Sequence, residues 1–337
     1  MINDPCFPQI ERASDVVYMR ELLQQMLFSN PAAGSVDSFL IELCQIANKR
    51  HKPGRSFVLS YRLIVRDDEN DERFEQIVSA RLCKTGQGLQ ELDSERKAYR
   101  KNLEEDSAVL YLHQLEMLLW LFPEDRKLVH LSKIMNQGLL KSHLGGILPL
   151  LNVGQSSQLL DVYPEVLHYL PERSCMIRYR LTIRDSDTDQ EIVKIIYGKN
   201  YQDDRGREVF ANMKQLARQL PNCARPLQYD DSFRTLWQSH LPGIPLVWSD
   251  FESLKTPELL VKMADCLARF QSCQLNTSLH YGFKEIDEQF RDTVKACQIV
   301  EQKLSVQISQ WIDQLISIRN EMGLVGMKLM KHPFIKI

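Results

Sequence analysis

The sequence lacks the features that mark membrane, secreted and nucleic-acid-binding proteins. None of its 337 residues lies in an apolar run of roughly 18 residues, the length that a membrane-spanning helix needs. The first residues contain no basic segment followed by an apolar one, so we expect no signal peptide. A net charge of -2 provides no basic field for nucleic acid. We therefore expect a cytoplasmic protein with no membrane and no nucleic acid among its partners.

The chain also lacks the cysteine spacing of a zinc site. Its eight cysteines include no CxxC pair, and its eight histidines are dispersed. The closest two cysteines, Cys266 and Cys273, are separated by about two turns of a predicted helix. We interpret the cysteines as buried free thiols in a reducing compartment, and we expect no metal ligands.

An internal repeat is the clearest feature that the sequence does contain. Residues 53–67 (PGRSFVLSYRLIVRD) and residues 171–185 (PERSCMIRYRLTIRD) are identical at eight of fifteen positions without a gap. An acidic turn follows each segment, and an apolar run then begins at Ile77 in the first copy and at Ile192 in the second.

The similarity between the two copies continues further along the chain. Each copy contains a Leu-Trp pair, which ends at Trp120 in the first copy and at Trp237 in the second. A proline follows each pair, Pro123 in one copy and Pro242 in the other. We interpret this ordered series as the duplication of one α/β unit, because two copies are too few for a solenoid.

The second copy has the pattern of an antiparallel sheet with one helix. Residues 176–183 and 192–197 are predicted to form a hairpin around an acidic turn. Residues 207–220 carry apolar side chains at steps of three and four, which predicts a helix. Residues 227–241 are predicted to form two further strands. The fold class is therefore α+β.

These segments resemble the small lobe of the aminoglycoside phosphotransferase-like kinases, a group that includes choline-kinase-like enzymes. The resemblance covers residues 162–274 and is carried by VLHYLPERSCMIRYRL, EIVKIIYGK and LQYDDSFRTLWQSHLPGIPL. It implies a kinase-like nucleotide-binding small lobe at 156–243, preceded by a degenerate related copy at 1–155. Residues 244–337 are then the first helices of a helical large lobe.

Lys194 is the first candidate for nucleotide binding. It lies in the apolar run 192–196, and both faces of this strand are expected to be covered, so a buried lysine there needs an anionic partner. The resemblance implies that this lysine binds the phosphates of ATP and pairs with Glu208. The alternative is a strand lysine that extends to solvent. The first copy has Ser79 at the matched position, with Arg81 on the same strand face.

Two further segments complete the expected nucleotide site. The resemblance places Arg173 and Ser174 in the loop that covers the phosphates, although this loop lacks glycine and is equally well explained as a tight turn. It places Gln238 and His240 in the segment that joins the lobes and binds the adenine edge through its backbone. We expect the ring of Trp237 to be a core aromatic.

Three arginines alternate on one predicted strand face. They are Arg178, Arg180 and Arg184. They are compatible with a site for an acidic substrate, but we favour a solvated strand face on which they pair with Asp and Glu.

The catalytic loop expected from the resemblance, His-x-Asp followed by Asn, is missing from the sequence. The segment 331–334 lies near the expected position, but Pro333 stands where the aspartate is needed. We therefore assign no catalytic residue and no metal ligand, although ATP and magnesium are the cofactors that the family implies. The chain is interpreted either as a fragment of a phosphotransferase or as a pseudokinase-like module.

Three functions remain open from the sequence. They are a truncated small-molecule kinase with an unknown acceptor, a module that binds a nucleotide or a protein without catalysis, and a structural protein without a ligand. Helical patterns at 257–274 and 285–320 are expected to leave apolar side chains exposed, including Trp311 and Leu315. Such stripes favour self-association.

Overall fold

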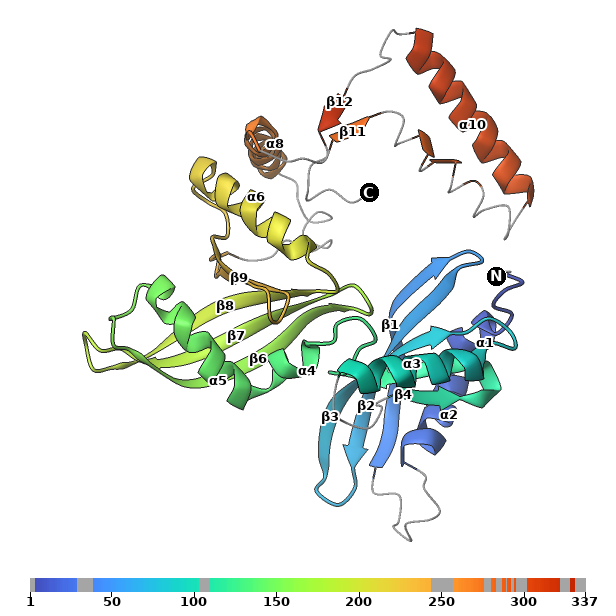
Figure 1. The fold of residues 1–337 in the computed structure, drawn as a ribbon, viewed down its shortest axis with the longest axis horizontal. Helices are drawn as coiled ribbons and strands as arrows, with labels where there is room; N and C mark the ends of the chain where they lie inside the picture. Colours follow the sequence, from blue (N-terminus) through green and yellow to red (C-terminus); the bar gives the residue numbers. More distant parts are fainter. Residues whose placement is uncertain are drawn as a thin grey trace. The chain divides into compact units, whose positions relative to one another are not determined.

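The computed structural model divides the chain into two compact units (Figure 1). Met1–Val129 and His280–Lys331 belong to the first unit, and His130–Leu279 and His332–Ile337 to the second. The residues that the structure describes are 4–28, 39–102, 109–243, 257–275, 280–282, 287–288, 290–291, 294, 302–321 and 328–330.

The first unit is built on a five-stranded antiparallel sheet with the order β1-β2-β3-β5-β4. Its elements are α1 (Ile10–Ser14), α2 (Val16–Phe28), β1 (Phe39–Lys52), β2 (Ser56–Asp67), β3 (Glu72–Leu82), α3 (Gly88–Asn102), β4 (Val109–Leu112) and β5 (Met117–Leu121). The same unit contains β11 (His280–Gly282), α10 (Gln302–Glu321) and β12 (Lys328–Met330).

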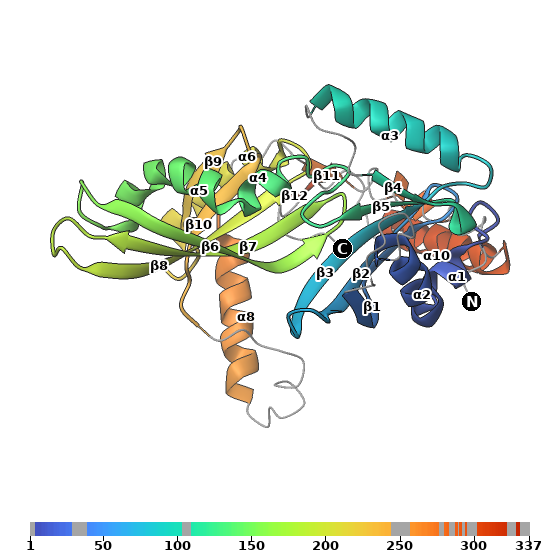
Figure 2. The same ribbon diagram turned by 90° about the horizontal axis from the view of Figure 1, so that it is seen from below.

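The second unit repeats this arrangement with the order β6-β7-β8-β10-β9, and its strands run side by side in Figure 2. Its elements are α4 (Leu131–Met135), α5 (Gln137–Leu144), the 3-10 helix η2 (Gly145–Leu151), β6 (Gln158–Leu170), β7 (Ser174–Arg184), β8 (Glu191–Tyr201), α6 (Arg205–Gln219), β9 (Pro226–Asp230), β10 (Thr235–Ser239) and α8 (Pro257–Ser272). The α+β class, the hairpins and the helix after the third strand are confirmed.

The division of the chain differs from the three parts expected at 1–155, 156–243 and 244–337. The units separate between Val129 and His130, because α5 packs on β6 and α4 packs on α5 and is bonded to Tyr179 of the second sheet. The residues after 243 are divided between the two units, with α8 in the second unit and α10 in the first.

The strand registers align the two sheets residue by residue. Tyr61 faces Val78 in the first sheet, and Tyr179 faces Ile196 in the second, a separation of 118 positions (179 - 61) for both members. Residues with positive φ angles recur at the same separation at three positions, namely Gly54 and Glu172, Asp71 and Asp189, and Glu116 and Arg234. The two units therefore share backbone conformation down to single turn residues.

This register corrects two residue matches made from the sequence. Gln76, and not Ser79, is the counterpart of Lys194, because Gln76 faces Leu63 as Lys194 faces Leu181. Arg81 is the counterpart of Lys199, because Arg81 faces Val58 as Lys199 faces Met176. The two Leu-Trp pairs are likewise offset by one residue. A shift of one residue moves a strand side chain to the other face of the sheet, so the two tryptophans lie on opposite faces.

The repeat extends to the helices that precede each sheet, which the sequence comparison missed. The buried Tyr61 hydroxyl donates to the carbonyl oxygen of Ala13 in α1 at 2.6 Å. The equivalent Tyr179 hydroxyl donates to the carbonyl oxygen of Ile134 in α4 at 3.1 Å. Each sheet is thus fastened to its own short helix by a tyrosine at the same place in the repeat.

One pair of core residues differs between the units in a compensating way. In the second sheet, Gly198 faces Trp237, and a Cβ atom on Gly198 would lie 2.8 Å from both the Trp237 and the Tyr179 rings. In the first sheet, Ala80 and Leu119 occupy the equivalent positions. The smaller leucine leaves room for the alanine methyl group, whereas the indole ring requires glycine.

Gly198→Ala is expected to destabilise the protein by about 1–3 kcal/mol, because the added methyl group overpacks the core. Adding Trp237→Leu, which restores the pair found in the first sheet, is expected to recover part of that loss. The measurement is a double-mutant cycle by urea denaturation. Gly145→Ala is the control, since nothing lies within 4 Å of its added Cβ. Simple additivity of the two changes would contradict the compensation.

A buried carboxylate holds the start of the first unit. Asp4 is 2% exposed and accepts hydrogen bonds from His51 Nε2 at 2.7 Å, Gly54 N at 2.8 Å and Cys6 N at 3.0 Å. Burial alone raises the Asp4 pKa, but the bonds from Gly54, His51 and Cys6 outweigh it and leave the pKa below its usual value. The ionised carboxylate therefore stabilises the folded state.

Because the folded-state pKa of Asp4 is depressed, its contribution is fully present above the unfolded-state pKa and is lost as the pH falls through the folded-state pKa. Asp4→Asn is expected to lower the free energy of unfolding at neutral pH by about 1–3 kcal/mol and to have little effect in strong acid. Urea denaturation at both pH values measures the difference. An equal loss at both would contradict the role of the charge.

Candidate functional site

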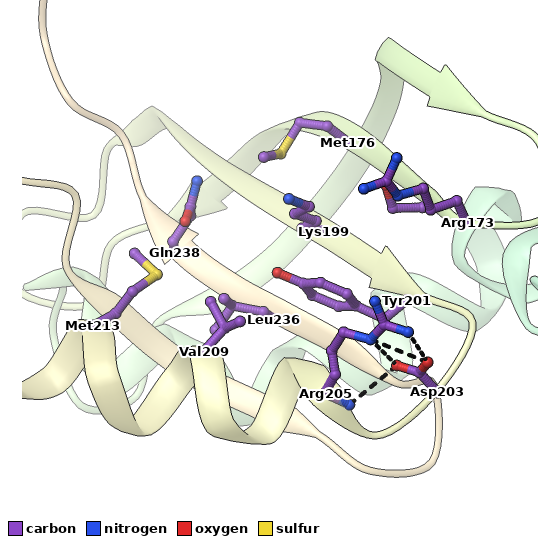
Figure 3. Close-up of a pocket in the computed structure, with 11 residues that line it drawn as sticks. Arg173, Met176, Lys199, Tyr201, Asp203, Arg205, Val209, Met213, Leu236 and Gln238 are labelled. Atoms are coloured by element: carbon purple, nitrogen blue, oxygen red, sulfur yellow. Dashed lines mark hydrogen bonds and ion pairs between the residues drawn. The ribbon is translucent and has the colours of Figure 1, made fainter. Parts of the chain in front are cut away.

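A pocket opens on the face of the second sheet that α6 covers (Figure 3). It has a volume of about 410 Å³. Its lining residues are Arg173, Ser174, Met176, Lys199, Tyr201, Asp203, Arg205, Val209, Met213, Leu236 and Gln238. Strands β7, β8 and β10 form its floor, and α6 forms one wall.

The alternation of side chains along β8 places the basic group in this pocket. Lys199 lies between Met176 on β7 and Leu236 on β10, so the three side chains occupy one face across three strands. Val209 and Met213, one turn apart on α6, pack over the same face. The sheet therefore holds Lys199 in an apolar surround with one open side.

Two cations in the pocket have no counterion among the described residues. The Lys199 ammonium lies 5.3 Å from the centre of the Tyr201 ring, and neither it nor the Arg173 guanidinium forms an ion pair there. Burial, followed by the charge of Arg173, lowers the pKa of Lys199. An anion that entered the pocket would relieve both unfavourable effects.

The carboxylate that lines the pocket is already engaged. Arg205 Nε lies 2.9 and 3.1 Å from the two carboxylate oxygens of Asp203, and its Nη2 lies 2.6 Å from Oδ2. Burial raises the Asp203 pKa, but the bonds from Arg205 outweigh it and lower the pKa below its usual value. This pair is neutral as a whole, so the two unpaired cations determine the charge of the pocket.

Half of the residues expected from the sequence lie in this pocket. Arg173, Ser174 and Gln238 line it. His240 lies beside it, where its ring stacks on Tyr197 with 5.9 Å between the centres, and its Nδ1 is 3.2 Å from the Tyr197 hydroxyl. Trp237 is fully buried on the other face of the sheet against Tyr179, which confirms its expected role as a core aromatic.

Lys194 does not take the expected position. It faces Leu181 across the hairpin and therefore belongs to the face opposite the pocket, whereas α6, which carries Glu208, covers the pocket face. Glu208 is not among the lining residues. The expectation that both faces of this strand are covered is wrong, because Val193 is 59% exposed.

Sequence reasoning missed Lys199 because it ended the strand at Tyr197. The strand continues to Tyr201, and its second lysine lies in the half that pairs with β10. A repeat alignment with a constant separation of 118 positions would have matched Lys199 to Arg81 (199 - 81) and pointed to this position.

The matching region of the first unit is closed. Arg81, the counterpart of Lys199, lies 3.8 Å from Glu91 on α3. Trp120, the counterpart of Gln238, packs with buried apolar neighbours that fill the region, namely Cys83, Leu92, Val109 and Leu118. The first unit therefore keeps the scaffold but has a neutralised cation and an apolar core where the second unit has a pocket.

The arginines on β7 are held by neighbours on the strand surface. Arg178 pairs with Glu165, and Arg184 pairs with Glu191 at 3.2 Å. Arg180 lies 5.2 Å from the centre of the Tyr163 ring. The favoured interpretation, a solvated strand face with acidic partners, is confirmed for the first two.

Several other expectations concern the rest of the chain. Within the described ranges, no group of three or more His, Cys, Asp and Glu side chains could hold a metal ion, and no helix is both long and apolar enough to cross a membrane. The segment 331–334 lies outside the described residues. Trp311 and Leu315 are 59% and 60% exposed, which confirms the exposed stripe.

Comparison of the chain with protein-family models, with curated proteins and with solved structures finds no match. The geometry of the pocket is therefore the basis for any statement about function.

Arg173→Ala is expected to raise the pKa of Lys199 toward its usual value near 10.5, because it removes the neighbouring positive charge and leaves only burial to lower the pKa. NMR of reductively methylated protein, with the Lys199 signal assigned through a Lys199→Arg variant, measures this shift. An unchanged Lys199 pKa would show that the two cations do not interact.

Proposed function

We propose that the second unit binds the phosphate groups of a nucleotide, as the small lobe of a kinase-like small-molecule phosphotransferase of the aminoglycoside phosphotransferase type. The observation that carries the proposal is the pair of cations, Lys199 and Arg173, that share one concave pocket and form no ion pair with any residue that the structure describes. The antiparallel sheet with a helix between its third and fourth strands agrees with the small lobe that the sequence resembles.

The chemistry of the pocket favours phosphate over a singly charged anion. A lysine ammonium and an arginine guanidinium together offer several N–H donors and two positive charges, which match a dianionic phosphate. Ser174 and Gln238 add neutral polar groups at the two ends of the floor. Met176, Leu236 and Met213 give the pocket apolar surface for the rest of the ligand.

In this proposal Lys199 replaces Lys194 as the phosphate-binding lysine, and Arg173 and Ser174 keep the role expected for the covering loop. Magnesium accompanies ATP in enzymes of this kind, but Asp203 is the carboxylate at the pocket and Arg205 already binds it. The described residues therefore do not fit a magnesium site, and no catalytic step is assigned to this chain.

The second candidate is a pseudokinase-like module that holds a nucleotide or a protein without catalysis. The first unit favours it, since this copy keeps the fold with a paired cation and an apolar cluster at the matching position. The phosphate acceptor stays open under both functions.

Lys199→Ala is expected to weaken the binding of ATP, ADP and pyrophosphate by roughly ten- to a hundredfold, which corresponds to the loss of one charge-assisted bond. Isothermal titration calorimetry with the full chain measures the affinity, and adenosine, which lacks phosphate, tests for recognition of the base alone.

One arginine variant and one lysine variant serve as controls for this experiment. Arg81→Ala removes the equivalent cation of the first unit, and Lys194→Ala removes the lysine on the opposite face of β8. Both are expected to bind like the unmodified chain. Equal binding by the Lys199→Ala variant, or an equal loss with all three variants, would overturn the assignment of the phosphate site.

A further inference from the structure

The cysteines that the structure describes fall into two groups by exposure. Cys44, Cys83 and Cys175 are buried, which agrees with the expectation of inert core thiols. Cys6, Cys223 and Cys273 are only half-buried, and Cys266 is exposed. The expectation of buried thiols is therefore wrong for these four, of which Cys223, Cys266 and Cys273 lie in the second unit.

Two of these thiols lie where α6 and α8 end. Cys223 follows the end of α6 and its Sγ donates to the carbonyl oxygen of Leu220 at 3.3 Å. Cys273 follows the last residue of α8 and its Sγ donates to the carbonyl oxygen of Arg269 at 3.3 Å. Each thiol is thus held at a helix terminus by a hydrogen bond to a backbone carbonyl group three or four residues earlier in the chain.

A pair of hydrogen bonds joins the same two helix ends. The Gln219 side chain donates from Nε2 to the carbonyl oxygen of Gln274 at 2.9 Å and accepts from the Gln274 N–H at 3.1 Å. Cys223 also lines a small apolar cavity with Phe270 of α8. Burial, and then the neighbouring Cys273 thiol, raise the pKa of Cys223.

We propose that Cys223 and Cys273 form a reversible disulfide that locks the C-terminal end of α8 against the end of α6. The Gln219 hydrogen bonds and the cavity that Cys223 shares with Phe270 hold together the two helix ends that carry these thiols, and neither thiol is sealed in the core. This inference does not depend on the proposed nucleotide site.

The bond forms by thiol–disulfide exchange with a small disulfide such as oxidised glutathione. One cysteine thiolate attacks the glutathione disulfide, forms a mixed disulfide and releases one glutathione thiolate. The second cysteine thiolate then displaces the other glutathione. Two cysteine thiols and one oxidised glutathione give one protein disulfide and two reduced glutathione molecules, and the two thiol protons pass to the released thiolates.

The lock acts on a helix that is largely exposed over its described side chains. Figure 2 shows α8 directed away from the sheet, and its described side chains before Phe270 are exposed, including Val261 and Leu267 at 63% and 51%. The hydrogen bonds of Gln219 hold one end of α8 in the reduced protein. A disulfide at that end restricts the separation of α8 from α6. Three residues of α6, Arg205, Val209 and Met213, line the pocket that contains Lys199.

Peptide mapping under non-reducing conditions tests the bond. Trypsin is expected to release residues 219–234 and 270–284, since Pro226 protects the bond after Arg225, and each peptide contains a single cysteine. After equilibration with oxidised glutathione, mass spectrometry of the full chain is expected to find these two peptides linked. Cys266→Ser, which removes the exposed thiol of the same helix, is the matched control and is expected to keep the link.

Hydrogen–deuterium exchange supplies the second measurement. Oxidation is expected to slow exchange across α8 at least tenfold in the unmodified chain and to leave it unchanged in Cys223→Ser and Cys273→Ser. Free thiols at both positions under oxidising conditions, or a link from Cys223 to another cysteine, would overturn the proposal. Unchanged exchange in the linked protein would also overturn it, because the bond would then not lock the helix.

Discussion

The strict alternation of side chains along β8 is the constraint on which the second unit depends. One face of this strand packs Ile196, Gly198 and Asn200 into the core, where Tyr179 ties the sheet to α4. The other face presents Lys199 to the pocket. Both sets are fixed by the same register, so the core cannot be packed without also placing the lysine beneath α6.

The sequence indicates the parts of this fold that depend on local patterns. The hairpin turns, α6 and α8 follow from acidic turns and from apolar residues at helical spacing, and these are confirmed. The short helices α1 and α4 could not be predicted in the same way. They are each five residues long, too short for a periodic pattern, and the tyrosine bonds that hold them are tertiary.

The candidate site was only partly accessible from the sequence for a related reason. Arg173, Ser174 and Gln238 were found because they lie in loops or strand ends that the resemblance marks. Lys199 was missed because the predicted strand ended at Tyr197, whereas Lys194 lies within it; the two lysines are five positions apart on β8 and point to opposite faces. The difference is set by strand pairing, which depends on residues distant along the chain.

The two units show how far a shared scaffold can diverge, and the core pair around Gly198 limits the order in which that divergence occurred. One unit has Ala80 with Leu119, and the other has Gly198 with Trp237. Alanine with tryptophan overpacks the core, whereas glycine with leucine leaves only a small gap. Glycine with leucine is therefore the intermediate pair that the core tolerates between the two arrangements, whichever unit preserves the older one.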